Sequence, residues 1–292
     1  MPSLKQITRK ISSVKGTRRI MSAMKLIAAV KLQRSQSMLN EFRPYSDVYK
    51  EIVLGVAGKC DPEIHPLLRK PEDTKKVHFV FFTSDRGLCG SFNTGLIRNF
   101  ENHLVSIPNE KSNITMSFVG RRGKDHCSTS GYEIGDYFNG ASEKNYTEIA
   151  KKLSNESIEM FQKGETDEVV LVYNYFRSAL VQEITFEKLL PFDIEQTDET
   201  TSTDYLYEPT REKIIGEIIP KYIQIRIERA IQESLTSEHA SRMTAMENAT
   251  NNADDVIKKL TLLFNKTRQA IITTELMDIV NGTEAQKKGG NE

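Results

Sequence analysis

Cysteine is scarce in this chain, with three residues among 292. An odd number of scattered cysteines (Cys60, Cys89 and Cys127) argues against a disulfide framework and favours a reducing compartment. No apolar run approaches the roughly 18–20 residues that a membrane-spanning helix needs. The beginning of the chain also lacks the apolar region of a signal peptide. These absences favour an intracellular protein without a membrane span.

Motifs for catalysis and ligand binding are equally scarce. The five histidines show no metal-ligand spacing, so we expect no metal site. Two residues separate the glycines of Gly120-Arg-Arg-Gly-Lys124, whereas a phosphate-binding loop needs four residues between its glycines and a Ser or Thr after its lysine. Cys89 lies in a turn beside a buried strand, where cysteine is more often packed than nucleophilic. We therefore predict no catalytic residue, no cofactor and no metal.

Charge is balanced overall but unevenly distributed. Basic and acidic residues number 40 each, yet residues 1–40 contain no Asp or Glu, and residues 192–208 contain no Lys or Arg. Blocks of like charge usually mark a solvated face or a docking surface. An acid-free, amphipathic beginning would also suit a transit peptide. The helical pattern runs past Leu39 without a cleavage-like break, so we interpret it as part of the folded protein.

Two long helices are predicted, one at each end of the chain. Over residues 3–43, Leu4, Ile7, Ile11 and Val14 repeat at the 3, 4, 3 spacing of a coiled coil. Pro44 should kink or end this helix, with a second helix over residues 45–56. Residues 221–281 contain neither Gly nor Pro, which predicts a rod of about 90 Å. Residues 210–219 extend this rod, Pro220 should kink it, and the tail after Gly282 should fray.

The middle of the chain alternates compact β-branched and aromatic runs with helical patterns, which predicts a small Rossmann-like α/β domain with a mostly parallel sheet. Strands are expected at 77–83, 114–119, 168–173 and 180–189, the last two paired across a turn, and helices at 91–105 and 146–162. The predicted fold class is therefore α/β, with a long antiparallel coiled coil beside this domain. Three domains are predicted. Residues 1–58 and 209–285 are the N-terminal and C-terminal coiled-coil helices, and residues 75–190 are the central α/β domain.

A long amphipathic helix cannot bury its apolar stripe alone, so the two helices should pair. Antiparallel pairing is favoured because a compact domain separates them in sequence. The first helix spans about 60 Å and the second about 90 Å. Part of the second helix must therefore lie outside the pair and carry apolar side chains there. This mismatch predicts a partner with a central hole or groove.

Four segments resemble the γ subunit family of F-type ATP synthases. These are Ile20–Leu32 (IMSAMKLIAAVKL), Thr83–Asn93 (TSDRGLCGSFN), Ser241–Ala253 (SRMTAMENATNNA) and Phe264–Leu276 (FNKTRQAIITTEL). They follow the family's order over both ends and the middle of the chain. Beyond Asn93 the central domain is similar mainly in its layout.

The resemblance implies a rotor shaft rather than an enzyme. Its coiled coil would stand inside a ring of α and β subunits, and its globular domain would rest with the ε subunit on the membrane c ring. The chain would then be peripheral, at the cytoplasmic face of a bacterial inner membrane, attached only through the complex. Met24, Arg242, Gln269 and Thr273 fall where family members contact β subunits, and we expect the last three to face outward. Tyr205, Tyr207 and Glu208 fall near ε and the c ring.

The alternative function is RNA binding by a coiled-coil arm. The N-terminal helix is basic, and a basic helical arm can bind RNA. The apolar seam among its charges favours a protein partner, and the β subunits' acidic inner surfaces are the counterpart that the resemblance implies. We therefore expect no nucleic-acid partner. Lys25 stands where some family members carry an acid, so local pairing should differ there.

Overall fold

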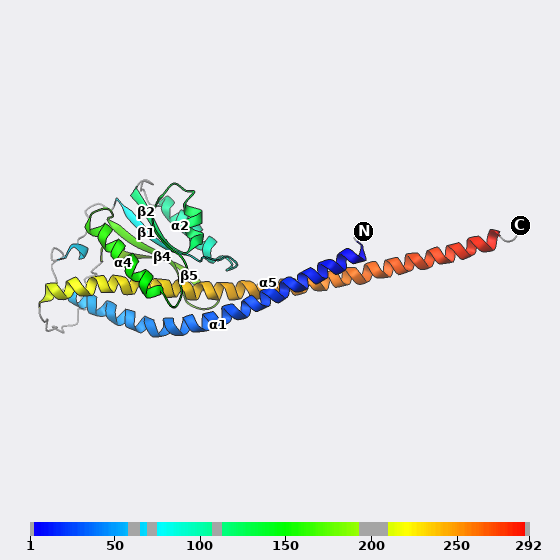
Figure 1. Ribbon diagram of the computed structural model, residues 1–292, viewed down its shortest axis with the longest axis horizontal. Helices are drawn as coiled ribbons and strands as arrows, with labels where there is room; N and C mark the ends of the chain where they lie inside the picture. Colours follow the sequence, from blue (N-terminus) through cyan, green and yellow to red (C-terminus); the bar gives the residue numbers. More distant parts are fainter. Residues whose placement is uncertain (1–2, 58–64, 69–74, 107–112, 193–209, 290–292) are drawn as a thin grey trace. The chain divides into compact units, whose positions relative to one another are not determined.

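The computed structural model describes residues 3–57, 65–68, 75–106, 113–192 and 210–289. Its longest elements are the helices α1 (Leu4–Ala57) and α5 (Arg211–Gly289), drawn in Figure 1. The chain divides into two compact units. Residues 28–244 form the first, which contains the β-sheet, and residues 1–27 with 245–292 form the second.

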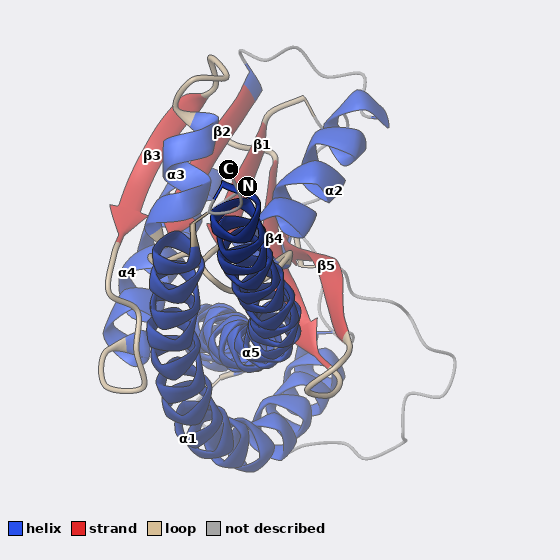
Figure 2. Ribbon diagram, turned by 90° about the vertical axis from the view of Figure 1, so that its right-hand side faces the viewer, coloured by secondary structure: helices blue, strands red, loops and turns tan. Residues whose placement is uncertain are grey.

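The sheet has five strands in the order β3-β2-β1-β4-β5, which Figure 2 shows across the domain. The strands are β1 (Val77–Phe82), β2 (Ile114–Val119), β3 (Glu133–Phe138), β4 (Glu168–Phe176) and β5 (Gln182–Leu190). β1 to β4 run parallel, and β5 pairs antiparallel with β4. The first five positions of a doubly wound dinucleotide-binding sheet have this order, so the Rossmann-like prediction is confirmed.

Both faces of the sheet are covered by other elements. Alternate residues of β1 point to opposite faces, and each set packs in a different core. Phe79 and Phe81 pack in a core with residues of the helix α2 (Phe92–Ser106). Val80 and Phe82 pack on the other side, with residues of α1, α5 and the helix α4 (Tyr146–Gln162). The short helix η2 (Pro66–Leu68) adds two buried leucines to this second core. The long helices are therefore built into the domain's core.

Three elements were not predicted: η2, the short helix α3 (Arg121–Cys127) and the edge strand β3. β3 is half exposed and reads EIGDYF, so it lacks the apolar run that marked the other strands. The prolines end neither helix: α1 continues through Pro44, where a kink or an end was expected, and α5 continues through Pro220, where a kink was expected. Buried neighbours such as Leu39 and Ile219 anchor these helices and offset the proline's cost of about 3 kcal/mol.

The helix α5 also continues through Gly282 to Gly289, where fraying was expected. In the second unit, it pairs with the first part of α1. Arg18 is ion-paired with Asp254 at 2.5 Å, and Lys25 with Glu247 at 2.6 Å. Residue numbers rise along one helix as they fall along the other, so the predicted antiparallel pairing is confirmed. The second pair also gives the partner of Lys25.

Candidate partner-binding surface

The far end of α5 lies outside the helix pair. Ile7 is buried near the start of α1 and Thr267 is buried on α5, whereas every residue from 268 to 283 is exposed. The exposed side chains include large apolar ones, namely Ile271, Ile272, Leu276, Met277, Ile279 and Val280. Contiguous apolar exposure of this kind is uncommon on proteins that work alone and marks an interaction site. We call residues 268–283 the tip.

Gln269 and Thr273 both lie on the tip and are exposed, as expected. The Thr273 hydroxyl donates a hydrogen bond to the carbonyl oxygen of Gln269, 2.9 Å away, so it is held against its own helix. The Gln269 side chain remains available to a partner. Met24 is half-buried on α1.

A second exposed apolar group on α1 was missed by the sequence reading. Ile20, Leu26 and Ile27 are all exposed, beside the half-buried Met24. Ile20 and Ile27 are seven residues apart, which places them on one face of the helix. The seven-residue spacing could have indicated a second apolar face, but only one apolar seam was assigned to this helix from the sequence. α1 therefore has an apolar face besides the one that packs on α5.

Arg242 does not face outward, and that expectation is wrong. Its side chain is only 13% exposed and is ion-paired with Glu238, one helical turn earlier, at 2.6 Å. It also donates hydrogen bonds to the carbonyl oxygens of Arg86 and Gly87, at 3.3 and 3.5 Å. A guanidinium has five donors in a fixed fork, so one side chain can hold both carbonyls and the carboxylate. Arg242 thus fastens α5 to the turn after β1.

The electrostatics around Arg242 follow from burial. Burial raises the pKa of the Glu238 carboxyl, and the charge and hydrogen bond of Arg242 oppose this shift. Burial also lowers the pKa of His239 to about 4, helped by the positive charges of Lys31 and Arg242. At neutral pH, this imidazole is therefore neutral. Arg242 thus favours the charged form of Glu238, against the effect of burial.

The turn over residues 84–90 is held by a small buried network. The Asn93 amide nitrogen donates to the Ser84 hydroxyl at 2.7 Å and to the Cys89 sulfur at 3.2 Å, and its carbonyl oxygen accepts from the Ser84 backbone at 2.9 Å. Burial raises the pKa of the Cys89 thiol, which makes this cysteine a weaker nucleophile. These contacts assign Cys89 to packing.

Leu88, within the same turn, is exposed to solvent. It is 62% exposed and has a φ of 64°, a left-handed conformation that is rare for an apolar residue. Backbone strain of this kind costs on the order of 1–3 kcal/mol and concentrates at functional segments. No feature of the sequence indicated it. Leu88 is therefore a separate candidate for partner binding, within the unit that contains the sheet.

Helix α5 packs on one face of the sheet and also bonds to β1 and β4 near their carboxyl ends. The strand order reverses between these two strands, and a doubly wound fold binds its ligand beyond the carboxyl ends at such a point. The Ser234 hydroxyl donates to the carbonyl oxygen of Phe82 at 3.4 Å, and the Ser237 hydroxyl donates to that of Asn174 at 3.0 Å. Both carbonyls belong to the ends of these two strands. Two serines of α5 thus fasten this helix to both strands.

Gly120 lies just before α3, and residues 121–124 form the first turn of that helix. Gly120 has a φ of 100°, and a Cβ atom there would lie 2.0 Å from the carbonyl oxygen of Thr83. The Thr83 hydroxyl in turn accepts a hydrogen bond from the Gly123 backbone at 3.0 Å. The glycine is therefore required by close backbone approach.

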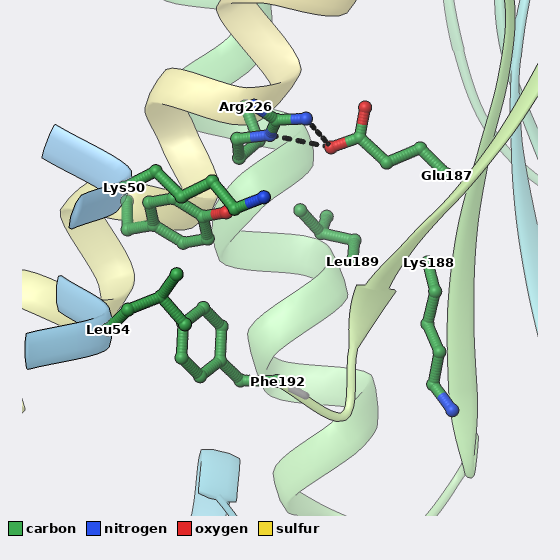
Figure 3. A pocket seen from close by; sticks show the side chains of 8 residues that line it. Lys50, Leu54, Glu187, Lys188, Leu189, Phe192 and Arg226 are labelled. Atoms are coloured by element: carbon green, nitrogen blue, oxygen red, sulfur yellow. Dashed lines mark hydrogen bonds and ion pairs between the residues drawn. The ribbon is translucent and has the colours of Figure 1, made fainter. Parts of the chain in front are cut away.

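A cavity of about 220 Å³ opens where α1, β5 and α5 meet (Figure 3). Phe192, Tyr222 and Leu54 supply its apolar walls. The Arg226 guanidinium donates to Glu187 at 2.6 Å, so its charge is neutralised within the chain. Lys50 reaches into the same space.

The remaining predicted site residues, Tyr205, Tyr207 and Glu208, lie outside the described residues, as does Cys60. Within the described part of the chain, His, Cys, Asp and Glu nowhere gather in a group that could hold a metal ion. Across that same part, no helix is long and apolar enough to span a membrane.

Comparison with known proteins gives consistent matches over most of the chain. The family model described as ATP synthase matches residues 3–286. The ATP synthase gamma chain of Trichlorobacter lovleyi is 41% identical over 289 residues, covering 98% of this chain and all of that one. The gamma chain of Bdellovibrio bacteriovorus is also 41% identical, over 295 residues, with the same coverage.

Solved structures of rotary assemblies share the fold. A chain in the central stalk and c-ring structure of the Tetrahymena thermophila mitochondrial ATP synthase has a TM-score of 0.60 at 25% identity, covering 79% of this chain and 99% of that one. A chain from the Euglena gracilis mitochondrial ATP synthase has a TM-score of 0.68 at 19% identity, covering 99% of this chain and 96% of that one.

Proposed function

This chain belongs to the ATP synthase gamma chain family, and from that premise we propose that it is the central-stalk rotor of an F-type ATP synthase. It is a non-catalytic subunit. Its partners are the α and β subunits of the catalytic ring, the ε subunit and the membrane c ring. Through these partners it couples proton flow to ATP synthesis, and it is peripheral at the cytoplasmic face of a bacterial inner membrane.

One observation carries the proposal. Helix α5 extends beyond the helix it pairs with, and its exposed residues 268–283 include six large apolar side chains. Such a surface needs a protein cavity around it, and an α/β ring supplies one. Rotation of the c ring turns the domain that contains the sheet, and the long helices carry this rotation to the tip. Because the tip is not symmetric, each β subunit meets a different face in turn. Its site then passes through tight, loose and open states, since contacts shift an equilibrium by their differential energy.

We propose specific contacts for the predicted site residues. Gln269, Thr273 and Met24 bind the β subunits directly. Arg242 contributes indirectly: it holds the turn over residues 84–90, and this turn presents Leu88 to the β subunits. These proposed contacts are supported by the exposure of Gln269 and Thr273 and by the strained, exposed position of Leu88.

The remaining three predicted residues are assigned to the other end of the stalk. We propose that Tyr205, Tyr207 and Glu208 contact the ε subunit and the c ring. Their support is the resemblance of the sequence alone.

Coexpression with α and β subunits of a relative tests the function. The full chain should coelute with both subunits from a size-exclusion column, and the assembled ring should hydrolyse ATP. A variant ending at residue 267 should bind more weakly than one ending at residue 283, which keeps the whole tip. Elution of the full chain apart from α and β would contradict the proposal.

A further inference from the structure

Two charged residues at the middle of the domain join three structural elements. Glu233 of α5 is 0% exposed, yet it accepts two hydrogen bonds from Arg43 of α1, from Nε at 2.9 Å and from Nη2 at 2.7 Å. It also accepts one from the backbone nitrogen of Phe176, at the end of β4, at 3.0 Å. A single buried carboxylate therefore binds a side chain of one long helix and the backbone of the sheet.

Arg43 completes the link from its own side. Its Nη2 donates to the carbonyl oxygen of Phe176 at 2.6 Å, and its guanidinium lies over the Tyr175 ring, 4.9 Å from the ring centre. Burial tends to lower the pKa of Arg43, but the hydrogen bond and charge of Glu233 outweigh it and raise that pKa. Arg229, one turn before Glu233 on α5, is ion-paired with Asp47 of α1. We call Arg43, Glu233 and the backbone of Phe176 the clamp.

A buried ion pair is a poor source of stability, because desolvation offsets much of its attraction. Apolar residues of similar size would hold the helices together as well. The clamp differs from apolar packing in being directional: charge-assisted hydrogen bonds constrain distance and angle, whereas the hydrophobic effect is non-directional. Its geometry opposes sliding of α1 along α5 and rotation of either helix against β4.

These constraints matter in a part that transmits rotation. Resting on the proposed function, we propose that the clamp is the joint through which torque passes from the sheet domain into both long helices at once. Arg43 and Glu233 are thus positioning residues for energy coupling, although they lie outside the candidate partner-binding surface. When the clamp is intact, rotation of the domain turns both helices together. When it is broken, part of the rotation is lost as slippage between the elements.

The test uses Glu233→Gln, which keeps the shape and an acceptor for Phe176 but removes the charge, and Arg43→Lys, which keeps the charge but removes the fork. Val53→Ala is the matched control, because Val53 is a fully buried residue of α1 that takes no part in the clamp. Each variant is assembled into the complete complex in inverted membrane vesicles. ATP hydrolysis and ATP-driven proton pumping are then measured on the same preparation, with the melting of each purified chain.

We expect both clamp variants to hydrolyse ATP but to pump fewer protons per ATP than Val53→Ala at matched melting temperature. Loss of one charge-assisted hydrogen bond should increase the population of the slipped joint about tenfold or more. A pumping-to-hydrolysis ratio equal to that of Val53→Ala would overturn the proposal. Failure of both clamp variants to assemble, when Val53→Ala assembles, would also overturn it by assigning the clamp to folding. Failure of the wild-type chain to assemble would instead refute the proposed function.

Discussion

Replacing Arg242 with alanine tests how the structure orients this residue. The substitution removes the ion pair to Glu238 and both hydrogen bonds to the turn over residues 84–90. The Glu238 carboxylate stays behind with a side chain only 14% exposed and without its cation. Breaking a buried pair costs about 3–5 kcal/mol, and leaving a buried polar group unsatisfied costs about 1–3. Because some solvent reaches this site, we expect Arg242→Ala to lower the free energy of unfolding by about 2–3 kcal/mol.

The pH dependence of this loss has a defined sign. Burial raises the pKa of Glu238, and removal of Arg242 takes away the charge that opposes this rise. The penalty should therefore be largest near pH 7.5 and should shrink as the pH falls toward 5, because a protonated carboxyl needs no cation. Urea unfolding of the purified chain, followed by circular dichroism at both pH values, measures it.

A second variant separates the charge effect from lost packing. Adding Glu238→Gln to Arg242→Ala removes the uncompensated charge, so the double variant should regain about 1–2 kcal/mol relative to Arg242→Ala. A loss below about 1 kcal/mol for Arg242→Ala is the scale of a surface substitution. That result, without any gain in the double variant, would show that Arg242 faces solvent and would refute the reasoning.

Three further predictions concern the fold and its lack of catalysis. Burial lowers the pKa of His78 and His239 to about 4, from 6.5, so stability should be fully present above pH 6.5 and should fall by up to about 3 kcal/mol per histidine as the pH drops toward 4. His78→Phe should flatten this dependence in urea unfolding, and an unchanged curve would contradict the assignment. A cysteine replacing Ile11 should cross-link to one placed within Leu260–Ile271 on the opposing helix, and linkage near Ile223 instead would indicate parallel pairing. The isolated chain should not bind ATP, because its sequence lacks a phosphate-binding loop, and stoichiometric binding at micromolar affinity in calorimetry would contradict this.

The sequence by itself determined the elements that depend on local periodicity. The apolar spacing of residues 3–43 and the absence of Gly and Pro over residues 221–281 predicted both long helices. β2 and α4 begin and end where the patterns predicted. These signals suffice because an amphipathic stripe or a buried strand is encoded within one segment. Unequal helix lengths also predicted the exposed end of α5, and four local motifs indicated the family.

Only the tertiary structure decided how polar side chains are used. Arg242, Gln269 and Thr273 look alike as polar positions on one helix, yet Arg242 turns inward because the turn after β1 packs beside it. Arg43 and Glu233 are 190 residues apart, so no local pattern pairs them. β3 escaped prediction because it is an edge strand with little apolar surface to bury. Periodicity records which face of an element is apolar, whereas the partner of each charge depends on which distant elements the fold brings together.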